Sequence, residues 1–488
     1  MIKVCVCCLL QLSEYIYQAS KDVCPKRSIV NNKEITPNNV PFTFELITLT
    51  DIAEKSTRVD IRSDAYEYQT HLKKYLKYPY YVAKIKGQKK SFAFGSVDFT
   101  NSTTLFDGII YVNGKLHFIE GIKVRKFSYT TLDLAGKSAL PEKWGTIKWV
   151  EERKYIYYTE DDIEPWSRIN DSIQAPLRHD KLSLVRKWWQ QVELLTSMTI
   201  PDGDTYEWNS NIKKVCSVNV LLDSYFMEKV FRYNIKQAIH EIIILYGSLD
   251  FLYRILDFSG IGLPNHFGFQ IAKITIDIRH NGFAPKQSGR YLLADKYMKH
   301  ISSLGLGNDR CLGVSFTFQN LEGVSGQAYQ GLPIGGIFVD KNDAIPENEN
   351  WNVAYVNFMH HVTKGVRRRG SILNTLAHEV GHAFGALHEE DTLCGLYENL
   401  LMAAHLREPG RFDNFKFSRC NIKLMRNIIK TRIEKFVKCP HQLKVYDNLV
   451  YIKYERWVNT SNLANNRWER DISFIIIVAT ICFQILFC

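Results

Sequence analysis

The sequence has no internal repeat and no motif typical of nucleic-acid binding. Its 62 lysine and arginine residues exceed its 51 aspartate and glutamate residues, which gives a formal net charge of +11. The basic residues are dispersed, apart from short clusters such as residues 84–90, so nucleic acid is not indicated as a partner. The positive balance favours anionic surfaces such as membranes or glycans.

Nothing in the composition departs from that of an ordinary globular protein, with 45% hydrophobic and 23% charged residues. At 488 residues, the chain is too long for one compact core. The length therefore predicts two or three domains.

An apolar run marks the N-terminus. Met1-Ile2-Lys3 is followed by a short apolar stretch that ends at Leu12. A positive start before such a stretch is typical of a secretory signal and predicts a signal peptide over residues 1–20. Glycosylation triplets at Asn101, Asn170 and Asn459 agree with passage through the secretory pathway to the cell surface or beyond.

A second apolar run, residues 472–488, ends the chain and is 17 residues long, which is marginal for spanning a bilayer. Small residues at 459–461 and a polar spacer at 462–471 also fit a glycolipid-anchor signal. Either interpretation predicts membrane anchoring through the C-terminus, with residues 441–471 as a stalk. The alternative is a frayed or truncated end.

The N-terminal half has the pattern of strands and no catalytic cluster, which predicts a β-rich domain over residues 21–165. Asn113-Gly114 is a strong hairpin turn signal. Mixed Pro, Asp, Ser and charged residues at 166–210 predict a linker. The predicted strands are residues 91–97, 105–112 and 115–120, with a further strand pair at 145–150 and 154–158.

Strands and helices alternate from residue 211 onwards, which predicts an α/β domain over residues 211–440. The predicted strands are residues 215–222, 267–278 and 311–318, with a short edge strand at 336–339. The predicted helices are residues 234–258, 291–302, 372–384 and 421–436.

One helix of this domain carries the pattern His378-Glu379-x-x-His382-x-x-Gly385-x-x-His388. Histidines four apart share one face of a helix, so His378 and His382 can bind the same Zn²⁺. Gly385 allows the helix to end and the chain to bring back His388 as the third ligand. Glu379 lies beside the metal and is the predicted general base for the attacking water.

Two alternatives to this interpretation are weaker. With 14 His and 28 Gly in the chain, the five identities are expected by accident only about 10⁻⁵ to 10⁻⁴ times. A structural zinc site is usually closed by a fourth Cys or His and has no use for the carboxylate of Glu379. The pattern therefore predicts a catalytic site with one zinc ion per chain.

Two other histidine clusters do not predict metal sites. His240-Glu241 begins like the motif but lacks its second histidine, and we interpret it as helix surface. His360-His361 is interpreted as part of a polar loop before the active-site helix.

The chain resembles the metzincin zinc endopeptidases in two places. One is the histidine motif, and the other is residues 399–403, which contain Met402 and resemble the Met-turn of that family. Within that family, the chain is similar to adamalysins (ADAMs) of the Kuzbanian or α-secretase type. The other segments that carry this resemblance are 256–261 and 414–422 and, in the N-terminal half, 94–97, 106–109 and 157–163.

The resemblance implies an α/β catalytic domain with a mixed twisted sheet, long helices, a zinc helix and a Met-turn. Met402 would then form a hydrophobic floor beneath the metal. Glu389 stands where many relatives have Asp and would keep a charged hydrogen-bonding role beneath the site. The β-rich domain would be an inhibitory prodomain.

The resemblance also implies disulfides between Cys216 and Cys311 and between Cys394 and Cys420, which leaves Cys439 without its expected partner. Three departures concern regulation. No cysteine occurs between Cys24 and Cys216 to act as a zinc-ligating switch, and no basic Arg-x-Lys-Arg site lies in the linker. The disintegrin and cysteine-rich modules that usually follow the protease are not expected here, because a short segment separates Cys439 from the apolar run at 472–488.

The sequence thus predicts a zinc-dependent endopeptidase of the secretory pathway, attached to the membrane. By resemblance, its substrates would be membrane-protein ectodomains, cut as by a sheddase. The alternative function is a catalytically weak or inactive metzincin that acts as a binding protein.

Overall fold

The structure is a computed structural model, and part of the chain is described by it. The described residues are 33–35, 44–49, 53–65, 67–76, 80–88, 91–98, 105–130, 146–163, 172–173, 213–256, 258, 267–279, 292–331, 335–339, 350–391, 400–404, 415–432, 435 and 437–439.

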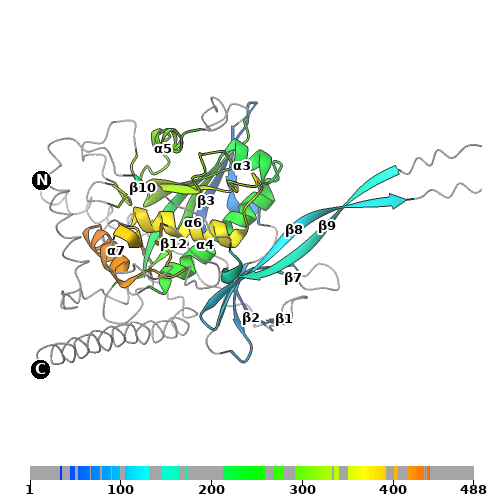
Figure 1. Ribbon diagram of the computed structural model, residues 1–488, viewed down its shortest axis with the longest axis horizontal. Coiled ribbons are helices and arrows are strands. Elements are labelled where there is room, and N and C mark those ends of the chain that lie inside the picture. Colours follow the sequence, from blue (N-terminus) through cyan, green and yellow to red (C-terminus); the bar gives the residue numbers. More distant parts are fainter. Residues whose placement is uncertain are drawn as a thin grey trace, which may run out of the picture.

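Two β-sheets organise these residues (Figure 1). The first, called the antiparallel sheet, has all its neighbouring strands antiparallel. Its strands in spatial order are β1 (Lys33–Ile35), β2 (Phe44–Leu49), β5 (Tyr80–Ile85), β6 (Phe92–Asp98), β7 (Leu105–Val112), β8 (Lys115–Thr130) and β9 (Thr146–Thr159).

The second sheet, called the mixed sheet, has parallel strands at its centre and antiparallel pairs towards its edges. Its strands in spatial order are β10 (Ser172–Ile173), β14 (Gly326–Tyr329), β15 (Val353–Asn357), β13 (Leu312–Thr317), β11 (Lys213–Leu222), β12 (Gly268–Asp277), β3 (Ala53–Arg62) and β4 (Glu67–His71), and β16 (Val437–Cys439) pairs with β11.

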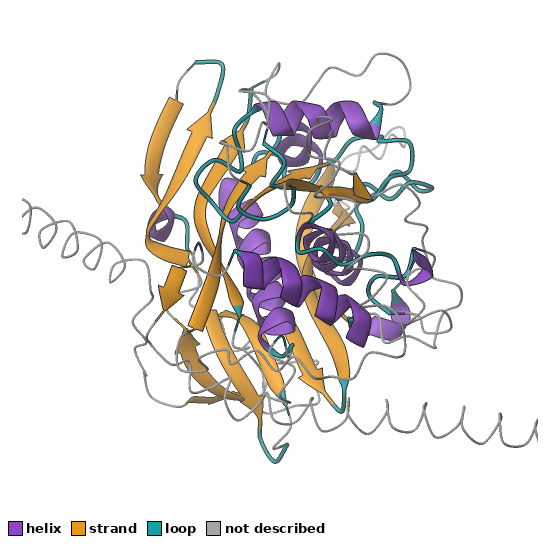
Figure 2. Cartoon of the chain, turned by 90° about the vertical axis from the view of Figure 1, so that its left-hand side faces the viewer, coloured by secondary structure: helices purple, strands orange, loops and turns teal. Residues whose placement is uncertain are grey.

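Two helices pack between the sheets. The helix α4 (Ile235–Arg254) contacts β12 of the mixed sheet and also β6 and β7 of the antiparallel sheet. The helix α6 (Arg369–Ala383) contacts β14 and β15 on one side and β8 on the other. Figure 2 shows helices packed against strands rather than gathered at one end of the molecule.

The other helices are short. They are α3 (Ser224–Lys229), α5 (Ala294–Ser303) and α7 (Arg419–Thr431), with 3₁₀ turns at Leu72–Lys74, Glu160–Asp162 and Glu389–Asp391.

Strand alternation explains how the mixed sheet covers both of its faces. Val220 and Leu222 belong to the core shared with α4 and α6, whereas Leu221 faces the opposite side. There it joins Tyr297 and Met298 of α5 in a separate core. The mixed sheet is therefore buried on both sides, as expected for its parallel centre.

Aromatic packing joins the two sheets into one core. The rings of Phe92 and Phe251 stack with their centroids 3.9 Å apart. A Cβ atom added at Gly247 of α4 would lie 2.1 Å from the ring of Phe94, so this position admits no side chain. Strand β3 also pairs in parallel with β12, so a segment of the predicted N-terminal domain completes the mixed sheet.

Most predicted elements agree with the structure to within a few residues. The strand at residues 105–112 and the turn at Asn113-Gly114 are confirmed, and both turn residues have positive φ, 52° and 83°. The strand pair predicted at 145–150 and 154–158 is wrong, because these residues form the single strand β9, which pairs with β8. The hairpin of β8 and β9 extends away from the rest of the described chain (Figure 1).

The edge strand predicted at 336–339 is also wrong. Gly336 and Phe338 have φ of 79° and 46°, which a strand does not accommodate, and the segment forms turns. The strand next to β15 is instead β14, and β10 forms the edge beyond it.

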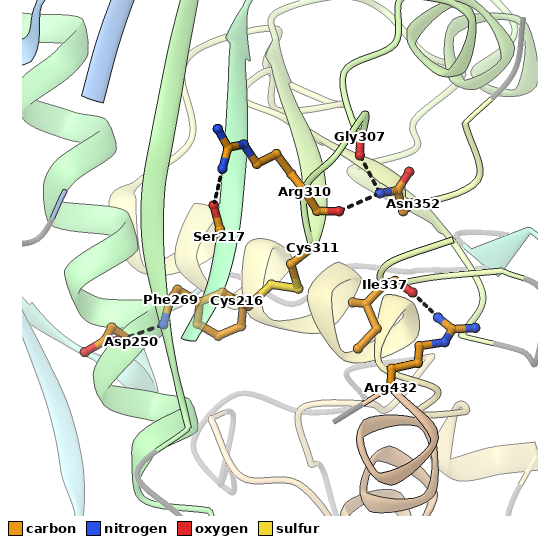
Figure 3. Close-up of a disulfide and its surroundings, with 10 residues drawn as sticks. All are labelled: Cys216, Ser217, Asp250, Phe269, Gly307, Arg310, Cys311, Ile337, Asn352 and Arg432. Atoms are coloured by element: carbon orange, nitrogen blue, oxygen red, sulfur yellow. Dashed lines mark hydrogen bonds between the residues drawn. A yellow bond between two sulfur atoms is a disulfide. The ribbon is translucent and has the colours of Figure 1, made fainter. Parts of the chain in front are cut away.

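A disulfide links the mixed sheet internally (Figure 3). Cys216 of β11 and Cys311, just before β13, form the pair that the resemblance implies. Cys420 is also disulfide-bonded, while Cys394 lies outside the described residues. The side chain of Cys439 is not described.

Among the residues that the structure describes, no helix combines the length and apolar character needed to cross a membrane. The predicted signal peptide, most of the linker, the stalk and the apolar tail at 472–488 lie outside those residues.

Candidate metal centre and active site

Within the described ranges, three histidines form the one group with the ligand chemistry of a metal site. They are His378 and His382 on α6 and His388 on the segment that follows it. Their ligand nitrogens all lie within 4.8 Å of one another, and the Nε2 atoms of His382 and His388 are 3.2 Å apart. The structure thus brings together the three residues that the motif predicts as ligands.

Hydrogen bonds fix the orientation of two of these rings. His378 Nδ1 lies 2.7 Å from the carbonyl oxygen of Leu401, and His382 Nδ1 lies 2.9 Å from that of Ala386. A carbonyl oxygen only accepts, so both Nδ1 atoms carry the proton and Nε2 keeps its lone pair.

This donor set fits zinc. Two nitrogens bound at 2.0–2.1 Å to one tetrahedral ion lie about 3.3 Å apart, close to the separation of the His382 and His388 Nε2 atoms. The neutral imidazoles, oriented by backbone carbonyls, are the form that binds a metal.

The carboxylate of Glu379 lies in the same buried region. Glu379 is 1% exposed and follows His378 directly on α6. A Cβ atom added at Gly326 of β14 would lie 2.7 Å from Glu379 Oε1. Glycine at this position lets the outer strand pass close to the carboxylate.

The chain turns at Gly385 to bring back the third histidine. Gly385 has φ of +99°, a conformation that favours glycine, and its amide donates to His382 O at 2.9 Å. A Cβ atom there would lie 2.6 Å from Ile428 Cγ1 of α7. Both the turn and the close contact explain a glycine at this place in the motif.

Met402 packs against the helix that carries His378 and His382. It is fully buried, and a Cβ atom at Gly381 of α6 would lie 2.7 Å from its sulfur. Its neighbour Leu401 accepts the hydrogen bond from His378. The residues around Met402 therefore support the helix and orient one ligand.

Glu389 follows His388 directly in the chain. It is 1% exposed, and its Oε1 accepts from Asn421 Nδ2 at 2.9 Å. Burial raises the pKa of Glu389 to about 7, and hydrogen bonds from Asn421 and Ser418 oppose the rise. No sequence pattern singles out Asn421, since its partners Leu387 and Glu389 are more than 30 positions away along the chain.

A segment that no sequence motif predicts lies next to the histidines. It runs from β14 to Gly331, whose amide donates to His382 O at 2.7 Å. Gln330 Nε2 donates to Ala386 O at 2.9 Å. The outer strand of the mixed sheet therefore runs alongside the histidine-bearing helix.

The start of α6 is tied to the antiparallel sheet by a buried ion cluster. Arg369 is 4% exposed and contacts Asp107 of β7 at 2.7 Å and Glu241 of α4 at 2.6 Å. Burial alone would raise the pKa of Asp107, but Arg369 and His240 outweigh it and hold that pKa well below its usual range. Asp107 is therefore ionised in the folded protein.

Side chains from other elements accept hydrogen bonds from the first backbone amides of α6. Arg368 at the N-cap makes no side-chain capping bond. Instead, Arg369 N donates to Glu120 Oε1 and Gly370 N donates to Tyr158 Oη, each at 2.8 Å. Side chains of β8 and β9 thus satisfy two of the amides that a helix leaves open at its start.

Glu120 gives this contact a pH dependence. Burial raises its pKa from 4.5 to about 7, Arg369 opposes the rise, and Glu241 adds to it. The folded state therefore binds a proton more tightly than the unfolded chain, so this contribution to stability is present below pH 4.5 and is lost as the pH rises through 7.

We expect Glu120→Gln to remove this loss, because the amide oxygen still accepts from Arg369 N and Tyr158. The unfolding free energy of the variant, relative to the unchanged protein, should rise by about 3 kcal/mol between pH 4.5 and pH 8. Denaturant unfolding at both pH values measures it. An equal pH dependence in both proteins would contradict the assignment.

The two other histidine clusters have structural roles. The prediction that His240 and Glu241 form helix surface is wrong, because the antiparallel sheet covers this face of α4. His240 bonds Tyr80 Oη at 2.8 Å and Asp107 at 3.3 Å. His360 Nδ1 accepts from the amides of Val362 and Thr363, which confirms the polar loop.

Known proteins are similar to this chain over part of its length. Residues 213–407 match the family model described as Metallo-peptidase family M12. The protein named "Disintegrin and metalloproteinase domain-containing protein 10" is 27% identical in Homo sapiens and Mus musculus, over 45% of this chain and 31% of the relative. The Xenopus laevis protein of that name is 26% identical over 44% of this chain and 30% of the relative.

The chain thus spans about a third of the length of these curated relatives. The match to a solved structure titled "Structure of a chaperone-substrate complex" covers 44% of this chain and 34% of the solved chain, at 12% sequence identity. Its TM-score of 0.23 is too low to indicate a common fold. The family model and the curated relatives support a metallopeptidase of the metzincin, ADAM-like type, with its matched region at residues 213–407.

Proposed function

We propose that this chain is a zinc-dependent endopeptidase. One observation carries the proposal, namely the convergence of three histidines, two of them with rings oriented by backbone carbonyls, beside the buried carboxylate of Glu379. The match of residues 213–407 to a metallopeptidase family supports it.

Each residue of the site has a role in this reaction. His378, His382 and His388 would hold zinc through their Nε2 atoms. Bound zinc would supply a Lewis acid that polarises the peptide carbonyl. Glu379 would accept a proton from the attacking water and deliver it to the leaving amine.

The mixed sheet binds an extended segment next to Glu379. Strand β14 lies beside Glu379 and pairs with β15 on one side. On its other side, it pairs in parallel with Ser172–Ile173 of β10. An extended segment of this same chain therefore already adds to β14, which is the way that many sheets bind peptides.

The finer proposals rest on the sequence. They are a prodomain over residues 21–165, membrane attachment through 472–488, passage through the secretory pathway, and sheddase-like cleavage of protein ectodomains of the Kuzbanian type. Extraction would test the anchor, since recovery in the aqueous fraction without detergent or phospholipase would exclude it.

The function is tested with the full chain and a mixed library of quenched peptides. We expect turnover that stops when zinc is chelated and returns when zinc is restored, because the three imidazoles provide the metal site. Zinc content measured beside turnover separates the alternatives. One zinc per chain without cleavage of any peptide would favour a binding protein, and cleavage unaffected by chelation would exclude a metallopeptidase.

A further inference from the structure

One amide side chain holds both neighbours of the third histidine. Leu387 N donates to Asn421 Oδ1 at 2.8 Å, and Asn421 Nδ2 donates to Glu389 Oε1 at 2.9 Å. His388 is the residue between Leu387 and Glu389. The two residues that flank His388 are thus tied to the same side chain of α7, Leu387 through its backbone amide and Glu389 through its carboxyl group.

Asn421 is itself held in place by its surroundings. It is fully buried, and its backbone N–H donates to the Oγ of Ser418, the N-cap of α7, at 3.2 Å. Met425 and Ile428, further along the helix, pack in the main core. The position of Asn421 is therefore set by the core and not by the histidine segment.

His388 needs such an anchor more than the other two histidines do. His378 and His382 are placed by the backbone of α6. His388 follows the turn at Gly385 and lies outside the helix. A further hydrogen bond near it runs from Glu389 N to Met402 O at 3.0 Å. A metal ligand on an irregular segment relies on surrounding hydrogen bonds for its geometry.

The chemistry of the anchor is specific to a carboxamide, which accepts with one atom and donates with the other. We propose that Asn421 is a positioning residue that directs the His388 imidazole towards the metal. This inference rests on the zinc site of the proposed function and adds to it a residue on a separate helix.

Asn421→Asp tests the inference with almost no change in shape. The new carboxylate still accepts from Leu387 N but no longer donates to Glu389. We expect zinc affinity, measured by chelator competition, to fall about 10- to 100-fold. The visible spectrum of the Co²⁺-loaded protein should also change, because it reports ligand geometry.

A second substitution exchanges donor and acceptor. In the double variant Glu389→Gln/Asn421→Asp, the glutamine amide can donate to the new carboxylate, so the pair is rebuilt in reverse. We expect zinc affinity and the Co²⁺ spectrum to return towards those of the unchanged protein. Recovery would show that the hydrogen-bonded pair, and not Asn421 alone, determines the affinity.

Asn352→Asp is a matched control. Asn352 is 3% exposed, and its amide donates to Gly307 O and Arg310 O in the loop between α5 and β13 (Figure 3). We expect it to lower the melting temperature and leave zinc affinity unchanged.

Unchanged zinc affinity in Asn421→Asp, or a loss that the double variant does not recover, would overturn the inference. If Asn421→Asp does not fold, Asn421→Ala carries the same comparison, and unchanged affinity there would overturn it as well. These readouts need no proteolysis, so failure of the proposed function would show separately, as zinc binding without peptide cleavage.

Discussion

Replacing Arg369 with alanine is expected to lower the unfolding free energy by about 3–5 kcal/mol. The guanidinium is 3% exposed and contacts Asp107, which is 5% exposed, and Glu241, which is 15% exposed. Removing it would leave two carboxylates in a buried site without their cation, and a buried charge that loses its partner is costly. Denaturant unfolding at neutral pH measures the loss.

The neighbouring arginine provides the control. Arg368 is exposed and lies over the ring of Tyr158, with its guanidinium carbon 5.4 Å from the ring centroid. We expect Arg368→Ala to cost no more than about 1 kcal/mol. Equal losses in the two variants would contradict a special role for the buried cluster.

Coupling between the partners gives a sharper test. Asp107→Asn and Glu241→Gln remove the charges that Arg369 compensates. Adding Arg369→Ala to that pair should therefore cost less than it does alone, by about 1–3 kcal/mol. Strict additivity would mean that the three charges do not act as one unit.

The ion cluster is one of several contacts that hold the N-terminal half against the domain with the histidine motif. The resemblance predicts a prodomain, yet Glu120 and Tyr158 close the start of the helix that carries His378 and His382. Phe94 fills the space over Gly247 of α4, and β3 extends the mixed sheet beside β12. Separating the two halves would thus expose apolar surface and uncap the histidine-bearing helix.

Local patterns predicted the elements that local chemistry determines. The strand at residues 105–112 is rich in β-branched and aromatic residues and ends at Asn113-Gly114, whose positive φ values suit a tight hairpin. The helix bearing the motif was placed within three residues of its observed start at Arg369. The histidines were found because their spacing matches the helical period.

Contacts between distant residues were not predictable in the same way. The pairing of β3 with β12 joins residues that are more than 200 positions apart. Asn421 and Arg369 acquire their roles from partners on other elements, and neither residue type is unusual on a helix. The strand beside β15 was misplaced because residues 336–339 are short and apolar, whereas β14 has the mixed sequence Gly-Gln-Ala-Tyr and gives a weaker strand pattern.

Replacing Glu379 with glutamine is expected to reduce peptide turnover by about 10²- to 10⁴-fold, the usual contribution of a general base. Glutamine keeps the shape of a side chain that is 1% exposed, so packing against Gly326 is preserved. The amide has no basic oxygen able to take a proton from the attacking water. Steady-state cleavage of a quenched peptide measures the change in kcat.

Zinc content decides what that loss means. The three histidines are untouched in Glu379→Gln, so the variant should bind one zinc per chain with unchanged affinity. Glu322→Gln, an exposed loop position, serves as the matched control and should keep full turnover. If Glu379→Gln loses zinc as well, the carboxylate helps to hold the metal site, and if turnover persists with zinc bound, the proton acceptor lies elsewhere. Loss of turnover with zinc retained would separate the two roles, binding by the histidines and proton transfer by Glu379.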